Sequence, residues 1–589
     1  MKRTLVIIVS ALLFCLCLHA GDFLYDENGA LFLAVIQNTG LFISNDGGLT
    51  WTDRSAGLPQ RIVYPDYGKG IKTLAAAAIG RTDGENAVLL AATSDAIYRS
   101  TDSGLSWKTV PVLPPVKPAD FFTCIDGDPD NADGIIVGTS YSGILETKDA
   151  GKTWIRHDDS LKQLYKGAGF YEEILNIEYS GDGTGRILLG TGYTNESFVF
   201  SDGVLNESGK AGVRTIPAPV KELGSRMNES DKPGRRTDPS QYTGRRGIYI
   251  NSLQAGSDKL DGHLDFCQKQ GLDSIVVDFK DDTGIVTFDI EYGLPEKIGA
   301  VRRRIDFDEL LEKVHSRGMY LIGRIVVFKD KELYKQKGFA IMDKDGGAWG
   351  KKFKIEGEDG EITYEQREFW VDPFNPDVWE YNTAIARELQ RRGIDEIQFD
   401  YIRFPSDGDT SRAVYPSRKP GMTRIEALES FLIRVREEIH IPISTDLYGF
   451  NSWYRMGNWI GQSIDLLADY VDIICPMFYP SHFPPGFLDN LEYLERAEII
   501  YREGSNRASA IVGGRAVIRP YVQAFLLPSE YYMEKPEYTK YLRLQVKGTL
   551  ESSASGFLLW NNSNRYYMVS GNLTGITKAA ETDLNSSLD

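Results

Sequence analysis

The sequence predicts a multidomain protein in which an all-β, propeller-like N-terminal domain is followed by an α/β domain of the eight-stranded (β/α)8 TIM barrel type. Two observations predict this organisation. A motif built from Asp, Gly and Trp occurs three times between residues 42 and 154, each time after a short apolar segment. From Arg246 onwards, short apolar segments alternate with amphipathic ones, which indicates βα units and a parallel sheet. The 589 residues are enough for two or three domains.

The N-terminus has the layout of a secretory signal peptide. Two basic residues, Lys2 and Arg3, precede an almost wholly apolar run from Leu5 to Leu18, and cleavage is expected after Ala20. The run is short for a membrane span, although a retained anchor is the alternative, and two cysteines within it leave a lipid-modified N-terminus open. We therefore expect residues 1–20 to be a signal peptide and the protein to be exported to the periplasm, the cell surface or the medium.

The three copies of the motif share the pattern Ser/Thr-x-Asp-x-Gly-x-Thr/Ser-Trp. Their aspartates, Asp46, Asp102 and Asp149, are separated by 56 and then 47 residues. In such a hairpin turn the Asp accepts backbone N–H groups, Gly supplies a positive φ, and we expect the Trp to cover the hairpin base. Units of this size at a fixed period are typical of propeller blades. A further strand pair at residues 187–203 continues the rhythm without a Trp.

These motifs resemble the Asp-box repeats of sialidases, sortilin-type receptors and related propellers. The resemblance implies a structural role for the three box aspartates, which are therefore not catalytic candidates. We expect residues 21–205 to form this domain and to offer the surface on which a protein partner would bind. Residues 206–244 are rich in Gly, Pro, Ser, Arg and Lys and are predicted to be a linker.

The barrel is predicted over residues 245–570, with a C-terminal tail at 571–589. Thr423 and Glu426 predict a capping box, and Asp359-Gly360 predicts a hairpin inserted after the third strand. An open, doubly wound sheet is the alternative, which the absence of a Gly-x-Gly-x-x-Gly turn disfavours. Eight strand candidates fit a closed barrel: 247–251, 274–280, 320–327, 394–400, 443–447, 471–477, 516–518 (entered through Ser509–Gly513) and 556–560.

In a barrel of this type the active site lies at the C-terminal ends of the strands. Asp400, at the end of the fourth strand, is the nucleophile candidate, and Arg403 is expected to keep it ionised. Asp446, one strand further on, is the preferred acid/base partner, with Asp278 as the alternative. Paired carboxylates suit acetal cleavage. Substrate-binding candidates on the same rim are Asp278, Lys280, Arg324, Arg403, Tyr479 and Trp560, although the cations could instead pair with neighbouring acids and Trp560 could pack in the core.

Other classes of function are disfavoured. The formal net charge of −17 argues against nucleic acid as a partner. No His pair has metal-ligand spacing and no phosphate-binding or nucleophile-elbow motif occurs, so we expect neither a metal nor another cofactor. Cys124, Cys267 and Cys475 are widely spaced in apolar surroundings and are expected to be buried thiols.

Residues 246–566 resemble a bacterial glycoside hydrolase barrel family that is distantly related to α-amylase-type enzymes. The segments that carry the resemblance are Gly247–Tyr249, Asp278–Lys280, Asp372-Pro373, Phe399–Pro405, Asp446–Gly449 and Pro476–Pro480. The resemblance implies that Asp400 occupies the nucleophile position. The acid on strand five is usually Glu in α-amylase-type enzymes, whereas Asp446 stands here.

The expected function is therefore that of an exported glycoside hydrolase that cleaves O-glycosyl bonds in a polysaccharide. A non-catalytic carbohydrate-binding or cell-envelope scaffold protein is the alternative. A sialidase that uses the β domain would need a complete propeller with an arginine cluster, and the repeats carry few arginines.

Overall fold

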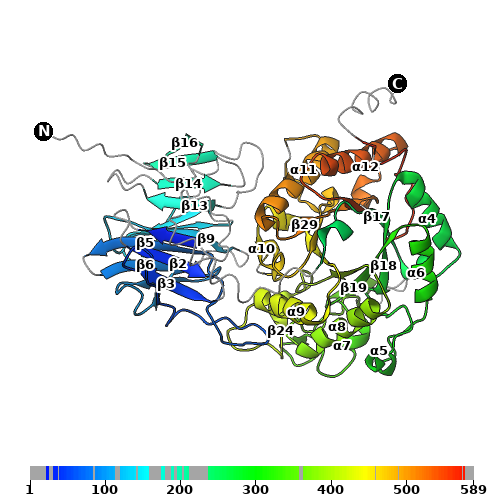
Figure 1. The fold of residues 1–589 in the computed structure, drawn as a ribbon, viewed down its shortest axis with the longest axis horizontal. Helices are drawn as coiled ribbons and strands as arrows, with labels where there is room; N and C mark the ends of the chain where they lie inside the picture. The colour runs from blue at the N-terminus through cyan, green and yellow to red at the C-terminus, as the bar shows by residue number, and fades with distance from the viewer. Residues whose placement is uncertain are drawn as a thin grey trace. The chain divides into compact units, whose positions relative to one another are not determined.

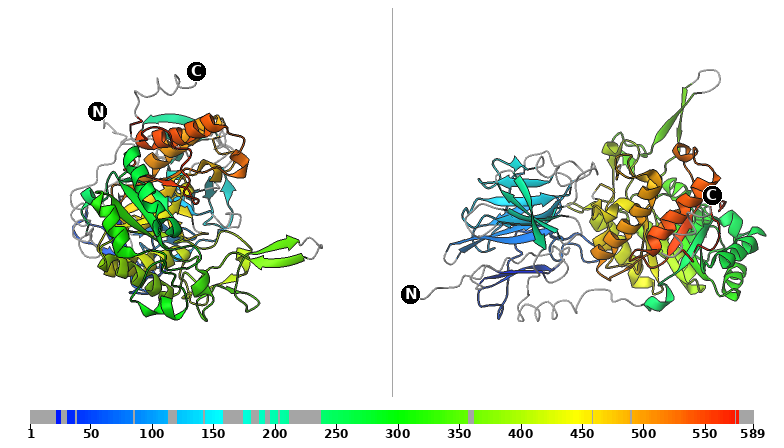
Figure 2. Two further views of the ribbon diagram at one scale, coloured as in Figure 1. Left: turned by 90° about the vertical axis from the view of Figure 1, so that its right-hand side faces the viewer. Right: turned by 90° about the horizontal axis from the view of Figure 1, so that it is seen from above.

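A computed structural model (Figures 1 and 2) divides the chain into two compact units, Met1–Ile62 with Asp66–Lys232 and Val63–Pro65 with Pro233–Asp589. The predicted signal peptide, most of the predicted linker and most of the C-terminal tail lie outside the described residues. In the part of the chain that is described, no helix is long and apolar enough to cross a membrane. The described residues are 22–25, 31–36, 39–83, 86–112, 120–140, 143–157, 174–179, 187–191, 196–201, 204–210, 237–356, 362–457, 459–488, 490–573 and 575–576.

The first unit contains four small antiparallel sheets, which confirms the predicted all-β organisation. In each sheet four strands follow one another in chain order, so that every strand pairs with its sequence neighbour. The last strand of the fourth sheet, β16, extends to Lys210 and so into the predicted linker. The strands are β1 (Asp22–Tyr25), β2 (Phe32–Ile36), β3 (Gly40–Ser44) and β4 (Thr52–Asp53); β5 (Ala76–Asp83), β6 (Asn86–Ala92), β7 (Ile97–Ser100) and β8 (Lys108–Thr109); β9 (Phe122–Gly127), β10 (Ile135–Thr139), β11 (Ile144–Thr147) and β12 (Ile155–Arg156); β13 (Ile174–Tyr179), β14 (Ile187–Thr191), β15 (Glu196–Ser201) and β16 (Val204–Lys210).

Each Asp-Gly-Trp motif forms the turn between the third and fourth strands of its sheet. In the second sheet, Asp102 accepts hydrogen bonds from the Ser106 amide (2.9 Å) and hydroxyl (2.5 Å), and from the Ser100 hydroxyl (2.7 Å). Gly104 adopts a φ of 82°. The same hydrogen bonds recur around Asp46 and Asp149, and those to the Thr or Ser of the turn are the main reason why the pKa of each box aspartate falls to about 2. The predicted roles of Asp and Gly are thus confirmed.

Two of the three tryptophans bind outside their own hairpin, which the sequence did not predict. The indole of Trp107 donates to the backbone oxygen of Arg54, just after β4, and that of Trp154 donates to Pro111, just after β8. In the second and third motifs, therefore, the Trp binds the chain leaving the preceding sheet, whereas Trp51 donates to Gly48 within its own turn. Sequence spacing predicts contacts within a hairpin, but not those between sheets.

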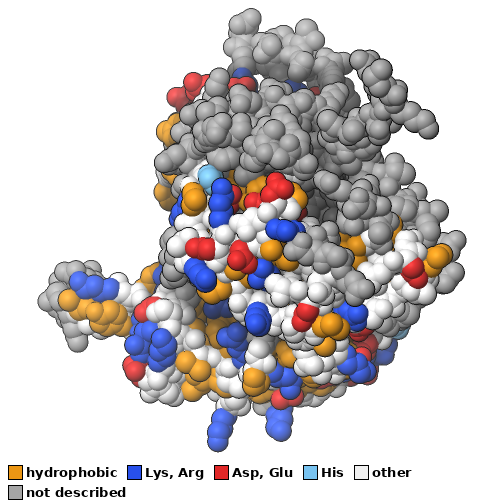
Figure 3. All heavy atoms as spheres, turned by 90° about the vertical axis from the view of Figure 1, so that its left-hand side faces the viewer, with side chains coloured by type: hydrophobic (Ala, Val, Ile, Leu, Met, Phe, Trp, Pro, Cys, Tyr) orange, Lys and Arg blue, Asp and Glu red, His pale blue; other side chains and the backbone are white. Residues whose placement is uncertain are grey.

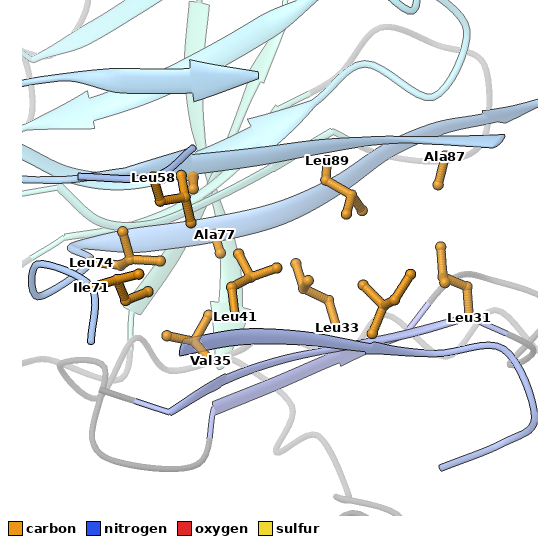
Figure 4. Packing of buried hydrophobic residues seen from close by; sticks show 12 residues of the cluster. Leu31, Leu33, Val35, Leu41, Leu58, Ile71, Leu74, Ala77, Ala87 and Leu89 are labelled. Carbon is orange, nitrogen blue, oxygen red and sulfur yellow. The ribbon is translucent and has the colours of Figure 1, made fainter. Parts of the chain in front are cut away.

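Apolar side chains pack between successive sheets of this unit. Figure 4 shows one such layer, in which Leu33, Val35 and Leu41 of the first sheet face Ala77 and Leu89 of the second. A second layer joins the second and third sheets. On the face of the molecule seen in Figure 3, Lys and Arg side chains are scattered among acidic and apolar ones.

The second unit is a closed barrel of eight parallel strands. The ring closes because β17 pairs with both β18 and β31, and β25 pairs with both β23 and β28. All eight predicted strands are present, and the seventh is interrupted at Pro520. Their bounds are β17 (Arg246–Ile250), β18 (Ser274–Lys280), β19 (Tyr320–Val326), β23 (Glu396–Asp400), β25 (Ile443–Tyr448), β28 (Ile473–Met477), β29 (Val517–Ile518) with β30 (Tyr521–Gln523), and β31 (Phe557–Trp560).

One predicted element is wrong. Ser509–Gly513, which we expected to lead extended into the seventh strand, is the C-terminal end of helix α11, and Gly513 caps it with a φ of 56°. A short apolar run does not by itself distinguish a strand from a buried helix end. Here Ala508, Ile511 and Val512 lie on the buried face of the helix.

Helices cover the outside of the barrel between the strands. The predicted capping box of α9 is confirmed, because Thr423 and Glu426 exchange the expected hydrogen bonds. The helices are α3 (Ser252–Ala255), α4 (Lys259–Gln270), α5 (Gly293–Lys297), α6 (Phe307–Ser316), α7 (Lys331–Tyr334), α8 (Pro376–Arg391), α9 (Arg424–Glu438), α10 (Ile464–Leu467), α11 (Tyr493–Val512) and α12 (Lys535–Leu550).

Short antiparallel elements interrupt this pattern on the side of the strand C-termini. The hairpin of β21 (Lys352–Glu356) and β22 (Ile362–Gln366) confirms the predicted insertion, although its Asp359-Gly360 turn lies outside the described residues. Figure 2 shows this hairpin projecting from the barrel. The loops after strands three and four are joined by β20 (Met342–Asp343) and β24 (Ala413–Val414), and β26 (Met456–Gly457) pairs with β27 (Gln462–Ser463).

Candidate active site

Charged side chains from four neighbouring strands meet inside the C-terminal half of the barrel. Asp278 of β18 is paired in register with Arg324 of β19. Asp400 ends β23, and Asp446 lies on β25 one position beyond the paired residues Phe399 and Thr445. Gln398, two positions before Asp400, is paired with Arg324. Because alternate residues of a strand face the same side, this register places all four side chains on the interior face of the barrel. All four are at most 6% exposed.

Arg324 connects two of the carboxylates. Its Nη1 donates to Asp278 (2.6 Å), while Nη2 and Nε donate to one oxygen of Asp400 (2.5 and 3.0 Å). The other oxygen of Asp400 accepts the amide of Tyr401 at 2.6 Å. Burial opposes the charge of the guanidinium, but Asp278 and Asp400 outweigh it and raise the pKa of Arg324 well above its usual value. The arginine is therefore a permanent cation between two acids.

Asp278 has a second partner in Tyr249, whose hydroxyl donates to it at 2.5 Å. Burial raises the pKa of Asp278, against the opposing effects of Arg324 and Tyr249. The ring of Trp560 stacks on Tyr249 with centroids 4.0 Å apart and lies 5.0 Å from the Arg324 guanidinium. Both oxygens of Asp278 are thus occupied by protein donors, and Trp560 is part of the wall around them.

Asp446 lies in a contrasting environment. It is 1% exposed, and within the described part of the chain its Oδ1 has no hydrogen-bond partner. Burial, followed by the charge of Asp400, raises its pKa well above the usual value, and Arg324 opposes that shift. Two neighbouring carboxyl groups therefore differ in kind, since Asp400 is ion-paired and Asp446 retains its proton to a higher pH.

Arg403 does not have the role expected from the sequence. Its Nη1 donates to the backbone oxygen of Phe404 (3.0 Å) and to Ser406 (3.3 Å), and Arg324 is the cation that pairs with Asp400. The chain turns sharply after the strand, because Tyr401 has a φ of 53°. A separation of three residues therefore does not place Arg403 beside Asp400.

Lys280 makes its contacts away from the acids of the candidate site. The pairing register of β18 shifts between Asp278 and Lys280, and the lysine is fully buried. Its Nζ contacts Asp330 (2.8 Å), the backbone oxygen of Val326 (2.5 Å) and Asn382 of α8 (3.0 Å). These contacts give Lys280 a structural role between strand and helix.

Tyr479 does lie close to the acids. Burial raises its pKa well above the usual value, and the charges of Asp446 and Asp400 contribute to the same shift. Its ring packs edge-on against Phe525 at 5.4 Å and near His482 at 5.3 Å. The structure therefore brings together Asp278, Arg324, Asp400, Asp446, Tyr479 and Trp560 of the predicted set.

Several residues of the barrel interior were not among the predicted site residues. Tyr249 binds Asp278, and below the acids Tyr521 donates to Gln398 at 2.5 Å, while Arg519 pairs with Glu396. The sequence did contain a signal for a polar interior, because Glu396, Gln398 and Asp400 alternate along a strand whose other residues are apolar. Alternating polar residues in a buried strand indicate a polar interior.

These acids do not line either of two cavities found on the surface of the described residues. One of about 550 Å³ is lined by Phe266, Tyr566 and Tyr567 among others, and one of about 460 Å³ lies between α11 and α12. In the described residues no group of three or more His, Cys, Asp or Glu side chains is arranged to hold a metal ion.

The fold and site define an eight-stranded parallel β/α barrel with a buried cluster of carboxylates at the C-terminal ends of its strands. The chain belongs to the family described as "Putative glycosyl hydrolase domain", whose model matches residues 247–566. No curated protein matches the chain.

Solved structures provide further similarities. A hypothetical protein from Ruminiclostridium thermocellum ATCC 27405 is 31% identical, over 34% of this chain and 96% of that protein, with a TM-score of 0.29. The PgaB (BpsB) glycoside hydrolase domain from Bordetella bronchiseptica is 14% identical, over 58% and 97% of the two chains, with a TM-score of 0.38. A trehalose-6-phosphate hydrolase from Bacillus licheniformis is 13% identical, over 54% and 64%, with a TM-score of 0.33.

Proposed function

We propose that this protein is a glycoside hydrolase that cleaves O-glycosyl bonds of a polysaccharide, with Asp400 and Asp446 as its catalytic pair. Membership of a glycosyl hydrolase family supports the class of reaction. The observation that carries the assignment of residues is the contrast between the two acids. Asp400 is ion-paired with Arg324, whereas Asp446 is buried, lacks a partner at Oδ1 and has a raised pKa. Environments that separate two carboxyl groups in this way assign one as base or nucleophile and the other as acid.

In the proposed mechanism, Asp446 donates its proton to the glycosidic oxygen while Asp400 attacks the anomeric carbon. The resulting glycosyl ester on Asp400 is then hydrolysed by a water molecule that Asp446 deprotonates. Neighbouring strands are about 4.8 Å apart, and the two acids lie side by side on such strands. We propose that the two carboxyl groups are correspondingly close and that the enzyme retains configuration, because inversion needs carboxyl groups about 6.5–9.5 Å apart to accommodate the water.

Asp278 is the alternative acid, and two contacts argue against it. Its oxygens already accept Tyr249 and Arg324, and the latter bond is part of an ion pair. Asp446 has a free oxygen and is therefore the better proton donor. We propose that Asp278, together with Tyr249, holds Arg324 in position to orient Asp400.

The test is product analysis on a panel of polysaccharides with Asp400→Asn and Asp446→Asn. Asp446→Asn should reduce the rate by about 10²–10⁴-fold, and Asp400→Asn by at least as much. Asp407→Asn is the matched control, since this exposed acid contacts Lys351 at 3.4 Å and the hydroxyl of Ser406 at 3.3 Å and neither of the two proposed catalytic acids. Normal turnover by folded Asp400→Asn would refute the assignment. Glycan binding without released sugar in the wild-type protein would favour a carbohydrate-binding protein instead.

We further propose that the chain is exported and that its four N-terminal sheets are blades of an Asp-box propeller that binds a protein partner. The N-terminal signal pattern and the three box turns support these proposals. Terminal sequencing of the mature protein tests the first, with Gly21 as the expected first residue.

A further inference from the structure

Arg403 is a nearly buried cation without a counter-ion. It is 8% exposed, and no carboxylate among the described residues lies within ion-pair distance of it. Three aromatic rings surround its guanidinium, at centroid distances of 4.7 Å (Trp370), 4.9 Å (Tyr448) and 5.0 Å (Tyr401). Charged side chains are rarely buried unless they are paired. This arrangement therefore calls for an explanation beyond packing.

The guanidinium is held in one orientation by its hydrogen bonds. Only Nη1 is engaged, by the backbone oxygen of Phe404 and by Ser406, whose hydroxyl also contacts that of Tyr448 at 3.2 Å. Nε and Nη2 have no acceptor in the described part of the chain, yet they are not sealed from solvent. The free Nε–Nη2 edge of an arginine presents two parallel N–H groups, which match the two oxygens of a carboxylate.

This edge belongs to the same loop as the proposed nucleophile. Tyr401 connects Arg403 with Asp400, because its amide donates to Asp400 while its ring lies against Arg403. A second cation, Lys329, lies 5.2 Å from the same ring, at 3.5 Å from Asp282 and 3.6 Å from Glu368. The rings beside Arg403 also offer apolar faces of the kind that stack on sugars. An anionic sugar bound at this edge would therefore contact the loop that follows Asp400.

We propose that Arg403 forms a subsite for an acidic sugar, so that the substrate is a polysaccharide with carboxylate-bearing units. The proposal rests on the function proposed above and specifies its substrate class. The three rings surround the guanidinium. The carboxylate of the substrate supplies the negative charge that the surrounding protein lacks. A neutral polysaccharide would leave the cation unpaired and would bind less well.

The first experiment needs no variant. Binding of the wild-type full-length chain is measured for polygalacturonate, alginate and hyaluronan, each against the same polymer with its carboxylates reduced to alcohols. At least one acidic polymer should bind at least about tenfold more tightly than its reduced form. Equal binding within every pair would overturn the proposal. Tighter binding of a sulfated or phosphate-bearing polymer than of any uronate would overturn the carboxylate assignment.

The second experiment tests whether Arg403 is responsible for the preference for the acidic polymer. Arg403→Gln should abolish the preference for the acidic polymer, and Arg403→Lys should restore it only partly because lysine lacks the two-pronged edge. Lys351→Gln, which removes a half-buried cation that does not contact Arg403, should leave the preference unchanged. Thermal unfolding confirms that each variant folds. An unchanged preference in folded Arg403→Gln would refute the site. An Arg403-dependent preference without hydrolysis of any polymer would refute the proposed catalysis but retain the subsite.

Discussion

Three carboxyl groups and one guanidinium lie together in the interior of the barrel. Arg324 pairs with Asp278 and Asp400, and the third acid, Asp446, keeps a free oxygen in a site with almost no exposure to water. A single cation cannot neutralise three buried anions, so the acid without a direct partner pays the highest cost of ionisation. The charge balance of the site therefore favours Asp446 as the proposed proton donor.

At the residue scale, this balance predicts how activity depends on pH. Asp446 can act as an acid only while it is protonated, and its pKa is raised. In the wild-type enzyme, kcat/KM should therefore fall as the pH rises through that elevated pKa. Asp446→Asn should lack this alkaline limb, which a pH–rate profile measures. An alkaline limb that persists unchanged in the variant would assign it to another group.

The same residue also predicts a dependence of stability on pH. Because the pKa of Asp446 is higher in the folded than in the unfolded chain, stability is lost as the pH rises from the unfolded value towards the folded one. Each unit of difference corresponds to about 1.4 kcal/mol. Asp446→Asn should thus gain at least about 1 kcal/mol relative to the wild-type protein between pH 4 and pH 8. Thermal unfolding at both values checks this, and equal gains at both would contradict it.

At the scale of elements, the box turns of the N-terminal unit join sheets as well as strands. Trp107 binds the chain leaving the first sheet, and the Arg54 side chain donates back to the backbone oxygen of Ser103 at 3.0 Å. Gly104 is packed closely there, because a Cβ at this position would lie 2.7 Å from the Cβ of Arg54. The turn thus needs its glycine for both conformation and space.

This arrangement predicts that Asp102→Ala destabilises the N-terminal unit. The substitution removes acceptors for the Ser106 amide and hydroxyl and for Ser100, and a net hydrogen bond contributes about 1 kcal/mol. We expect a loss of about 1–3 kcal/mol in denaturant unfolding. Asp130→Ala, at an exposed acid in the loop between β9 and β10, is the control. Equal stability of the two variants would contradict a structural role for the box.

At the scale of the whole molecule, each unit has its own apolar core. The N-terminal unit buries residues between its sheets, and the barrel buries a separate cluster inside its ring. Units with separate cores need not unfold together, and a single two-state transition is then not expected.

We therefore predict two transitions in calorimetry of the full chain. Asp102→Ala should lower only one of them, and Asp446→Asn at pH 8 should raise only the other, because each substitution lies in a different unit. A single transition, or a shift of both transitions by either variant, would show that the units unfold as one.

Much of this organisation could be predicted from local patterns. Apolar strands, the capping box at Thr423 and the Asp-Gly-Trp turns depend on neighbours within a few residues, so composition and spacing reveal them. The rule that barrel sites lie at strand ends likewise selected Asp400, Asp446 and Asp278. Ser509–Gly513 was predicted wrongly because a short apolar run fits a strand and a helix end equally well.

The sequence by itself thus determined the two kinds of domain, the eight strands and the acids at their ends. Only the tertiary structure decided the partners: Arg324 instead of Arg403 for Asp400, a buried ion pair with Asp330 for Lys280, and a free oxygen for Asp446. The physical reason is that these contacts depend on the register between strands and on the turn at Tyr401. Residues that are far apart in the chain, or turned away from one another within it, meet only once the ring has closed.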